Sequence, residues 1–256
     1  TGKGDITPIT NLEMAYKAAK SMEVAAPDLS RICGIALNGD PENNSIDVRD
    51  YQTFWLGVKT NLKGYNPTAP DAVLPALADI SAYLYNDHNT DPLIKAALVH
   101  YQFEMIHPFE RYNGIVGRII VPMVLRDTIG EAMPLICLSE YLYHNKNEYF
   151  DLLRTTQYSG GYIRWIKFFV CAVGEAAKQS AKLLAQYEND ILWAEQQIKE
   201  NTLSSKSIWG VYNYLKRYPV SSISRATEQT RFSFNSISKA MQSLKETGIV
   251  QETAAV

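Results

Sequence analysis

The spacing of apolar and polar residues predicts a mainly helical chain. Apolar residues recur at helical intervals over residues 11–22, 28–37 and 70–85, and polar or Gly- and Pro-containing stretches separate these segments. Residues 91–106 are apolar on every side of a helix, and such a helix belongs in the middle of a core. This helix is expected to start at an Asp91 N-cap and to end before Pro108.

The same pattern predicts helices further along the chain. A second apolar helix is expected from Ile115 to about Thr128, kinked at Pro122. Helices are also expected over 141–156 and 162–177, followed by a long polar helix over 176–201. One stretch breaks the pattern: β-branched and aromatic residues in 46–59 lack helical spacing and predict an extended segment or hairpin.

The C-terminal part has an arrangement of its own. It predicts three helices, over 206–218, 222–229 and 235–246, and then a strand over Ile249–Glu252. Three helices followed by a strand is the order of a winged helix-turn-helix. We therefore expect a helical domain over 1–175, a linking helix over 176–202 and a winged helix-turn-helix over 203–256.

Composition supports one sizeable core and a smaller one. The chain has 256 residues, 46% of them hydrophobic, and a net charge of −2, which argues against disorder and against a nucleic-acid binder as a whole. Segment 203–256 differs, because seven basic and three acidic residues give it a net charge of +4. It could bind DNA through its third helix, at Asn235, Ser236, Ser238 and Lys239, or it could serve as a protein-interaction module.

Cysteine usage and hydropathy bear on the compartment. Cys33, Cys137 and Cys171 are far apart in the sequence and form no CxxC pair, which argues against a metal site or a disulfide framework. No apolar run approaches the roughly 20 residues that span a bilayer. We expect a cytoplasmic protein without a membrane contact, and pairing with a second copy of the chain stays open.

The segment with the clearest chemistry connects the two apolar helices. It begins with a histidine at the end of the first helix and passes through Asn-Gly into the N-terminus of the next. The free N–H groups of such a terminus bind anions, and Asn113 and Gly114 suit the backbone of an amide nest. Arg118 lies one turn further on, within reach of a phosphate chain, and His107 could take a proton from an incoming hydroxyl.

This segment resembles the Fic family signature, HPFx(D/E)GN(G/K)RxxR. Its residues are His107-Pro108-Phe109-Glu110-Arg111-Tyr112-Asn113-Gly114-Ile115-Val116-Gly117-Arg118. The resemblance extends over about residues 10–175, including the preceding helix from Ala96 to Ile106. It implies an all-α Fic-type domain with a short β flap.

The resemblance also implies a reaction and a site. Fic proteins commonly transfer AMP from ATP to a hydroxyl side chain of a target protein. His107 would be the base, and the nucleotide would contact Asn113, Gly114, Gly117 and Arg118. Arg111 is a further candidate nucleotide contact, which comes from this chain's own residue and not from the resemblance. The flap at Trp55, Leu56 and Gly57 would hold an extended target segment by β-augmentation.

The chain departs from the signature at three positions. Arg111 stands where the family has the acidic residue that helps to hold Mg²⁺, and a cation there repels the metal. Tyr112 replaces a glycine, and Ile115 replaces the first arginine. Glu110 could stand in for the missing metal ligand, or Arg111 could neutralise phosphate in place of the metal.

Three functions are therefore compatible with the sequence. The first is a protein adenylyltransferase with an altered metal position. The second is a non-catalytic nucleotide sensor that controls the C-terminal module, and the third is a scaffold for protein or DNA with an empty site. A purely structural role is the alternative for His107, in which it caps its helix and takes no part in chemistry.

Overall fold

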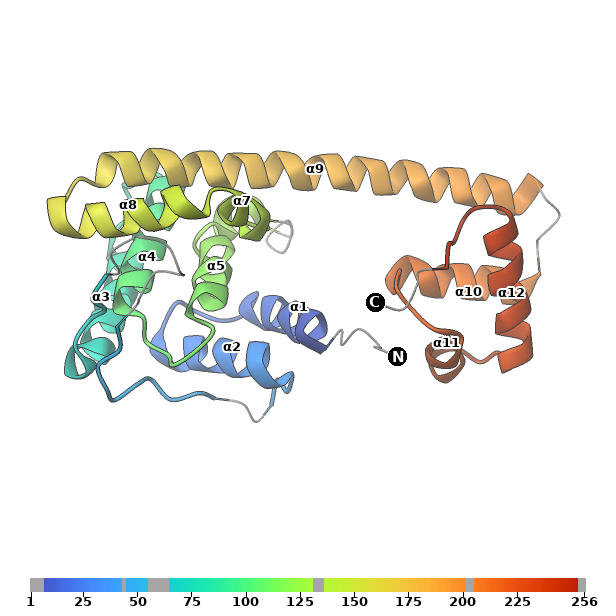
Figure 1. Ribbon diagram of the computed structural model, residues 1–256, viewed down its shortest axis with the longest axis horizontal. Coiled ribbons are helices and arrows are strands. Elements are labelled where there is room, and N and C mark those ends of the chain that lie inside the picture. Colours follow the sequence, from blue (N-terminus) through green and yellow to red (C-terminus); the bar gives the residue numbers. More distant parts are fainter. Residues whose placement is uncertain (1–6, 43–44, 55–64, 131–135, 201–204, 253–256) are drawn as a thin grey trace. The chain divides into compact units, whose positions relative to one another are not determined.

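The computed structural model describes residues 7–42, 45–54, 65–130, 136–200 and 205–252. Regular structure in these residues is helical, which confirms the all-α fold class. Figure 1 shows the helices, whose bounds are α1 (Thr7–Ala19), α2 (Ala26–Asn38), η1 (Pro70–Ala72), α3 (Val73–Asn86), α4 (Pro92–Ile106), α5 (Asn113–Val124), α6 (Arg126–Ile129), α7 (Ser139–His144), α8 (Lys146–Ser159), α9 (Tyr162–Glu200), α10 (Lys206–Arg217), α11 (Ile223–Gln229) and α12 (Phe234–Glu246).

Helices α4 and α5 lie between two hydrophobic cores. One side of the pair packs with α1, α2 and α3 in a core that contains Phe103, Phe109 and Ile119. The other side packs with α7, α8 and the first part of α9 around Trp165, whose indole N–H donates to the Ala97 carbonyl at 2.8 Å. Figure 1 shows α4 and α5 between the α1–α2 pair and α8. Their junction, residues 107–112, is anchored in the first of these cores by Phe109.

The predicted helices are present, with differences at their ends and breaks. Asp91 caps α4 as expected, its carboxylate accepting from Leu93 N–H at 2.8 Å. The helix predicted over 141–156 is interrupted at Asn145, which separates α7 from α8. The apolar pattern of 70–85 indicates a buried face with Leu74, Leu77, Ile80 and Leu84. On α3, Leu77 and Ile80 are buried as expected, whereas Leu74 is 53% exposed and Val73 is buried in its place.

Helix α9 runs without interruption over 39 residues. The sequence pattern predicts two helices here, over 162–177 and 176–201, and α9 joins both. The residues become more polar after about residue 177, but this change does not require a break in the backbone. The chain forms two compact units, Asp5–Ser180 and Ala181–Val256, and α9 contributes residues to both. Within the described residues no helix combines the length and apolar character that crossing a membrane requires.

The C-terminal unit contains three short helices and the end of α9. Its core combines Ala194 and Ile198 of α9 with Val211, Ile237 and Leu244 of the following helices. Residues 249–252 follow α12 without forming a strand, so the strand predicted there is wrong. Val250 N–H instead donates to the Leu244 carbonyl at 3.2 Å, which turns the chain back onto α12. A wing is thus not present within the described part of this unit.

Residues 46–54 also form neither a strand nor a helix, so no hairpin is present in the described part of the predicted extended segment. The backbone is tied to its surroundings by single hydrogen bonds. Ile46 N–H donates to the Ser30 carbonyl at 3.2 Å, and Arg49 N–H donates to the Pro108 carbonyl at 2.8 Å. The expected flap residues Trp55, Leu56 and Gly57 lie outside the described residues.

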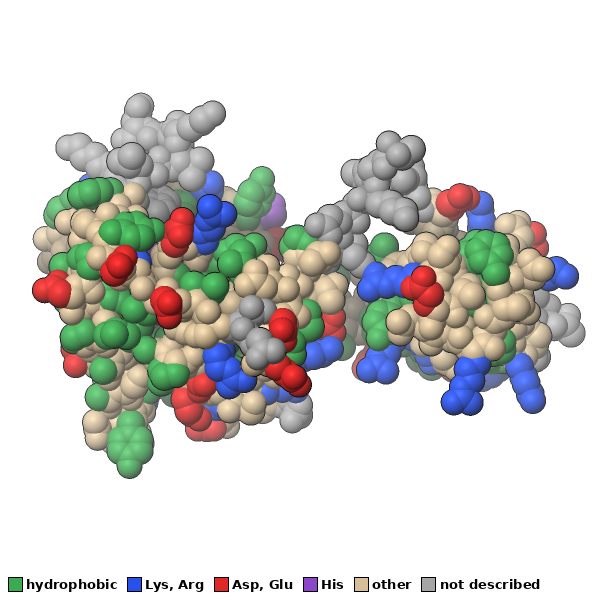
Figure 2. Space-filling model, turned by 90° about the horizontal axis from the view of Figure 1, so that it is seen from below, with side chains coloured by type: hydrophobic (Ala, Val, Ile, Leu, Met, Phe, Trp, Pro, Cys, Tyr) green, Lys and Arg blue, Asp and Glu red, His purple; other side chains and the backbone are tan. Residues whose placement is uncertain are grey.

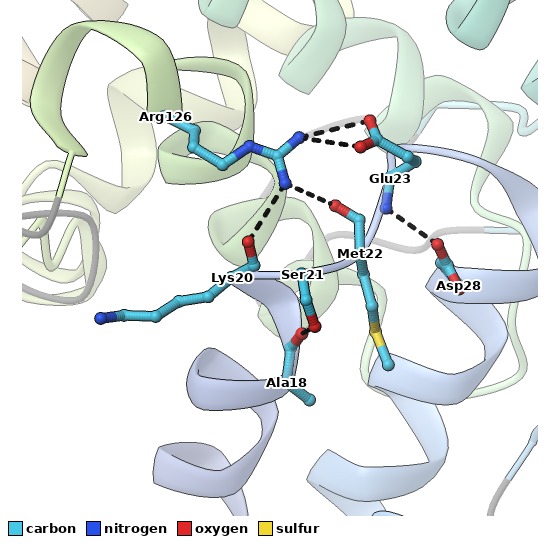
Figure 3. Close-up of polar contacts among 7 residues, drawn as sticks. All are labelled: Ala18, Lys20, Ser21, Met22, Glu23, Asp28 and Arg126. Carbon is cyan, nitrogen blue, oxygen red and sulfur yellow. Dashed lines mark hydrogen bonds and ion pairs between the residues drawn. The ribbon is translucent and has the colours of Figure 1, made fainter.

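Arg126 ties the end of the α5 region to the turn between α1 and α2 (Figure 3). Its guanidinium donates to the carbonyls of Lys20 and Met22 at 3.2 and 3.0 Å and to the Glu23 carboxylate at 3.2 Å. Glu23 N–H in turn donates to Asp28 at the start of α2 at 2.8 Å. Hydrogen bonds from a charged donor to backbone carbonyls fix the α1–α2 turn against the C-terminal end of α5.

Candidate functional site

His107 ends helix α4 in an unusual backbone conformation. Its φ and ψ of 50° and 61° lie in the left-handed region, while its N–H still closes the last turn on the Phe103 carbonyl at 2.9 Å. A residue with a side chain adopts this conformation at a cost of about 1–2 kcal/mol. The surroundings therefore have to impose it.

Arg49 supplies that constraint. Its side chain is buried and donates to the carbonyl of His107 at 2.8 Å, to that of Ile106 at 3.0 Å and to those of Tyr51 and Thr68. These bonds satisfy carbonyls that the end of an α-helix leaves without partners. Arg49 thus holds the end of α4, and with it the direction of the His107 side chain.

Tyr65 determines which imidazole nitrogen carries the proton. Its hydroxyl donates to the Glu104 carbonyl at 3.0 Å and lies 3.2 Å from His107 Nδ1. The hydroxyl proton is then committed to Glu104, so Nδ1–H is the donor to the Tyr65 oxygen and Nε2 keeps its lone pair. Burial, and next the positive charge of Arg49, lower the pKa of His107 to about 4. At neutral pH the imidazole is uncharged and able to accept a proton.

The loop after His107 is closed by Asn113. The Asn113 side chain donates to the Phe109 carbonyl at 2.7 Å and accepts from Phe109 N–H at 2.9 Å. Phe109 itself is fully buried in the core. Tyr112, with φ of 66° and ψ of 8°, adopts the left-handed conformation directly before α5. The residue that replaces the family's glycine therefore keeps a backbone shape that glycine favours.

The N-terminus of α5 presents free donors. The first N–H groups of a helix have no partner within it, and among the described residues Asn113 and Gly114 donate to none outside it. Arg118 curls back over this end: its Nη1 would lie 3.2 Å from a Cβ on Gly114. Backbone donors, the helix dipole and a guanidinium thus meet at one place, which is the arrangement that binds phosphate.

Gly117 has a packing role. A Cβ there would lie 2.6 Å from Glu104 Oε1 and 3.3 Å from His100 and Phe103, so its missing side chain lets α5 approach α4 closely. His100 donates from Nδ1 to the Gly117 carbonyl at 2.9 Å and pairs through Nε2 with the Tyr149 hydroxyl at 3.0 Å. The structure shows Gly117 packed against α4, and its expected contact with the nucleotide stays a prediction.

The residues present do not fit a magnesium site. Mg²⁺ takes oxygen ligands, whereas position 111 supplies a guanidinium. Glu110 and Arg111 are both exposed and lie 3.9 Å apart as an ion pair. The described residues contain no group of three or more His, Cys, Asp or Glu that could hold a metal ion. Ile115, at the other altered position, packs partly against the N-terminal core.

The structure places four of the sequence-predicted site residues around one loop. His107, Asn113, Gly114 and Arg118 border one loop and one helix terminus, while the Arg111 side chain points into solvent. Sequence reasoning missed Arg49, Tyr65 and Glu104. Glu104 could have been found, because a carboxylate on a helix that is otherwise apolar all round is rarely buried without a reason.

Comparisons with known proteins point to one family. Residues 31–125 match the family model described as Fic/DOC family. A stretch of 64 residues is 38% identical to Protein adenylyltransferase fic-1 of Caenorhabditis briggsae, covering 24% of this chain and 12% of that protein. A stretch of 119 residues is 28% identical to a probable protein adenylyltransferase of Aquifex aeolicus, covering 42% of this chain and 34% of that protein.

A solved structure of a Fic family protein from Desulfovibrio desulfuricans G20 is also similar. It has a TM-score of 0.60 at 20% identity, and the alignment covers 70% of this chain and 54% of that chain. Similarity at this identity bears on the fold. The chain matches only about an eighth to a third of the length of the two curated relatives.

Proposed function

We propose that this chain, whose residues 31–125 match the Fic/DOC family model, transfers the AMP moiety of ATP to a hydroxyl side chain of a target protein. The observation that carries the proposal is the meeting of three features at residues 107–118. These are a neutral imidazole with a free Nε2, the free N–H groups at the start of α5, and the Arg118 guanidinium above them.

The proposed reaction is an in-line displacement at the α-phosphorus of ATP. The target hydroxyl oxygen forms a bond to this phosphorus, the bond to the bridging oxygen breaks, and pyrophosphate leaves. His107 Nε2 takes the hydroxyl proton, while Arg118 and the N–H groups of Asn113 and Gly114 stabilise the phosphate charge. The negative phosphates would raise the pKa of His107 from its low value in the free protein, which makes it a stronger base when ATP is bound.

No step of this proposal passes through a metal ion, because position 111 supplies a guanidinium and the described residues contain no group of three or more metal-ligating side chains. Arg111 is exposed at the mouth of the loop and could neutralise phosphate charge instead. The two hydrogen bonds between Asn113 and Phe109 fix the loop at the start of α5, which favours an anion site that is formed before ATP arrives.

The test combines binding and labelling. Calorimetry with ATP, with and without Mg²⁺, measures binding, and labelled ATP measures self-modification. His107→Ala should retain binding but lower labelling by about 10²–10⁴-fold, the usual contribution of a general base. His88→Ala, the same substitution at an exposed histidine, should label like the parent. Equal labelling by His107→Ala would remove His107 as the base.

The C-terminal unit supports a second candidate function, in which a nucleotide-sensing domain controls DNA binding. Helices α11 and α12 are joined by a short turn, as in a helix-turn-helix, and Ser222 and Ser233 cap them. Arg225, Arg231 and Lys239 are exposed, and Figure 2 shows Lys and Arg side chains projecting from this unit. ATP binding without labelling would favour this function over transfer.

Binding to a short duplex at several salt concentrations tests the second candidate. Each phosphate contact contributes about −0.9 to the slope of log affinity against log salt. Lys239→Ala should therefore reduce the slope by about one, whereas Lys17→Ala on α1 should not change it. Absence of binding at low salt would exclude DNA as the partner of this unit.

A further inference from the structure

Glu104 is a buried carboxyl group that the proposed reaction does not use. It lies on α4, one turn before His107, and is 5% exposed. Its Oε1 is buried and has no hydrogen-bond partner among the described residues. Because a buried ionised carboxylate without a partner is strongly unfavourable, an orphaned oxygen at this place needs a physical explanation.

The orphaned oxygen lies at the anion site. Glu104 Oε1 would be 2.6 Å from a Cβ on Gly117 and 4.0 Å from a Cβ on Gly114. Arg118 Nη1 would be 3.2 Å from the same Cβ on Gly114. Side chains on a helix lean toward its N-terminus, so the space beside Gly114 adjoins the free N–H groups of α5. The carboxyl and the guanidinium therefore flank the place where a phosphate would bind.

Other titratable groups around Glu104 keep a fixed protonation state near neutral pH. Burial lowers the pKa of His100 to about 4, so this neighbour is neutral. Three tyrosines face Glu104 or Arg118: Tyr65 before α3, Tyr149 on α8 and Tyr16 on α1. Burial raises the pKa of each of them. Arg118 on α5 is the cation that faces Glu104.

Glu104 behaves differently from these neighbours. Burial raises its pKa to about 7, and the opposing effect of Arg118 is the smaller one. Its charge therefore changes in the range where its neighbours do not titrate. From its position and its pKa, Glu104 is the group whose protonation should respond most to an anion at the N-terminus of α5.

We propose that Glu104 is a positioning residue that acts through Arg118, and that an anion at the α5 N-terminus binds with the Glu104 carboxyl neutral. Ionised Glu104 competes with the anion for the charge of Arg118 and repels the anion. Once Glu104 takes up a proton, the guanidinium and the backbone donors are left to the anion. The identification of this anion as the phosphate chain of ATP rests on the proposed function.

The coupling has a definite sign. A bound phosphate disfavours the carboxylate, so the pKa of Glu104 is higher in the complex than in the free protein. Anion affinity is then independent of this group below the free pKa of about 7. Above it, affinity falls by up to about tenfold per pH unit until the pKa of the complex is reached, and binding takes up about one proton in that range.

The experiment counts protons. ATP and, separately, inorganic pyrophosphate are titrated into the parent and Glu104→Gln at about pH 8, in buffers of different ionisation enthalpy. Glu104→Gln keeps the shape and the neutral state of the side chain. The parent should take up nearly one proton more than the variant and bind up to about tenfold more weakly. Because the ligand's own phosphate titrates with both proteins, its contribution cancels in the difference.

The controls separate this inference from the proposed function. Glu148→Gln removes an exposed carboxylate from α8 and should behave like the parent. Equal proton counts in the parent and Glu104→Gln would overturn the role of Glu104 while leaving ATP binding intact. If pyrophosphate binds with extra proton uptake but ATP does not bind, the role of Glu104 stands and the proposal that ATP is the substrate is excluded. If neither anion binds, both proposals are overturned.

A second measurement does not depend on the variant. The carboxyl carbon signal of Glu104 in the parent protein can be titrated by NMR with and without pyrophosphate. A pKa near 7 that rises on binding is expected. An unchanged pKa would overturn the proposal even if Glu104→Gln fails to fold.

Discussion

At the residue scale, the chemistry of His107 is set by side chains that are distant in the sequence. Arg49 precedes it by 58 residues and holds its carbonyl, and Tyr65 precedes it by 42 and contacts its Nδ1. One fixes the backbone and lowers the imidazole pKa, and the other selects the tautomer. The site therefore includes residues outside its loop motif. Substitutions of Arg49 or Tyr65 should change the pKa or the tautomer of His107 although His107 itself is unaltered.

Arg49→Met tests the first of these contributions. Loss of the cation removes a factor that lowers the pKa of His107, so this pKa should rise from about 4 toward its ordinary value. The free energy of unfolding should fall by about 3 kcal/mol, because several carbonyls lose a charged donor. Ring-proton NMR titration and urea denaturation measure the two effects. Arg31→Met, at an exposed position of α2, should change neither, and an unchanged His107 pKa in Arg49→Met would contradict the assignment.

The altered positions of the motif give a second residue-scale prediction. Arg111→Asp combined with Ile115→Arg restores the residue types of the family signature at an exposed and a partly buried position. If the site is only weakened by these changes, labelling with ATP and Mg²⁺ should increase at least about tenfold, since a metal can then bind the acidic side chain. Labelling is measured at equal ATP occupancy. Failure of both the parent and the double variant to label with any divalent metal would argue against transfer.

The sequence singled out the motif residues as candidates but not the side chains that support them. His107, Asn113 and Arg118 stand out because their types and spacing match a known chemistry. Arg49 lies in a stretch of β-branched and aromatic residues that suggested a strand, and nothing in that pattern shows that its side chain folds back onto α4. The same is true of Tyr65, which lies 42 residues before the histidine that it contacts. Long-range side-chain contacts of this kind are not encoded in local periodicity.

At the element scale, the close approach of α4 and α5 is a requirement of the site. Gly117 allows it, because any Cβ there would collide with Glu104 Oε1 at 2.6 Å. The two helices carry His107 and Arg118 respectively, so their separation sets the distance between base and phosphate contact. A methyl group at this position should push them apart.

Gly117→Ala should therefore lower the free energy of unfolding by about 1–3 kcal/mol through overpacking, and weaken ATP binding as well. Gly174→Ala is the matched control. Gly174 lies in α9, where a Cβ would meet no described atom within 4 Å, so alanine there should stabilise the chain by up to about 1 kcal/mol. Urea denaturation compares the two variants. A stabilised Gly117→Ala would mean that α5 does not need this contact.

The periodicity of apolar residues predicted which segments form helices, but it did not predict several of the positions where these helices begin or end. Asn145 ends α7, and its side chain donates back to the Tyr141 carbonyl at 2.9 Å, a local hydrogen bond that competes with helix continuation. Helix α9 continues through a change of face because no Pro or capping residue stops it. The strand predicted at 249–252 is absent because its β-branched residues pack against the unit's own core rather than pairing with a neighbour.

At the scale of the whole molecule, the two compact units have separate cores. The clusters of the N-terminal unit extend from Ala15 to Ala176, and the cluster of the C-terminal unit starts at Ala194. The residues of α9 that belong to the second unit include the fully buried Ile198. The domain boundary suggested by the sequence, residue 203, stays a prediction, and fragments can test whether the helix end before it is needed.

Fragment 181–256 should fold cooperatively, whereas fragment 203–256 should not. The longer fragment keeps Ala194 and Ile198 in the core, the Tyr187 hydroxyl bond to the Lys216 carbonyl at 2.8 Å and the Lys216–Glu195 ion pair at 3.2 Å. The shorter one exposes the apolar surface that Ile198 covers, and burial of such a side chain contributes about 1.5–3 kcal/mol. For a chain of about 54 residues, which is marginal in any case, that loss is decisive.

Circular dichroism during urea denaturation distinguishes the outcomes. A single steep transition is expected for 181–256 and a shallow loss of helix for 203–256. Ile198→Ala in the longer fragment should reproduce part of the loss, since it removes the buried side chain but keeps the helix, whereas Leu192→Ala at a 67% exposed position should not. If 203–256 folds as well as 181–256, α9 is only a connection. If it does not, the C-terminal unit depends on the same helix that lines the core behind His100, and any DNA-binding measurement on this unit requires the longer fragment.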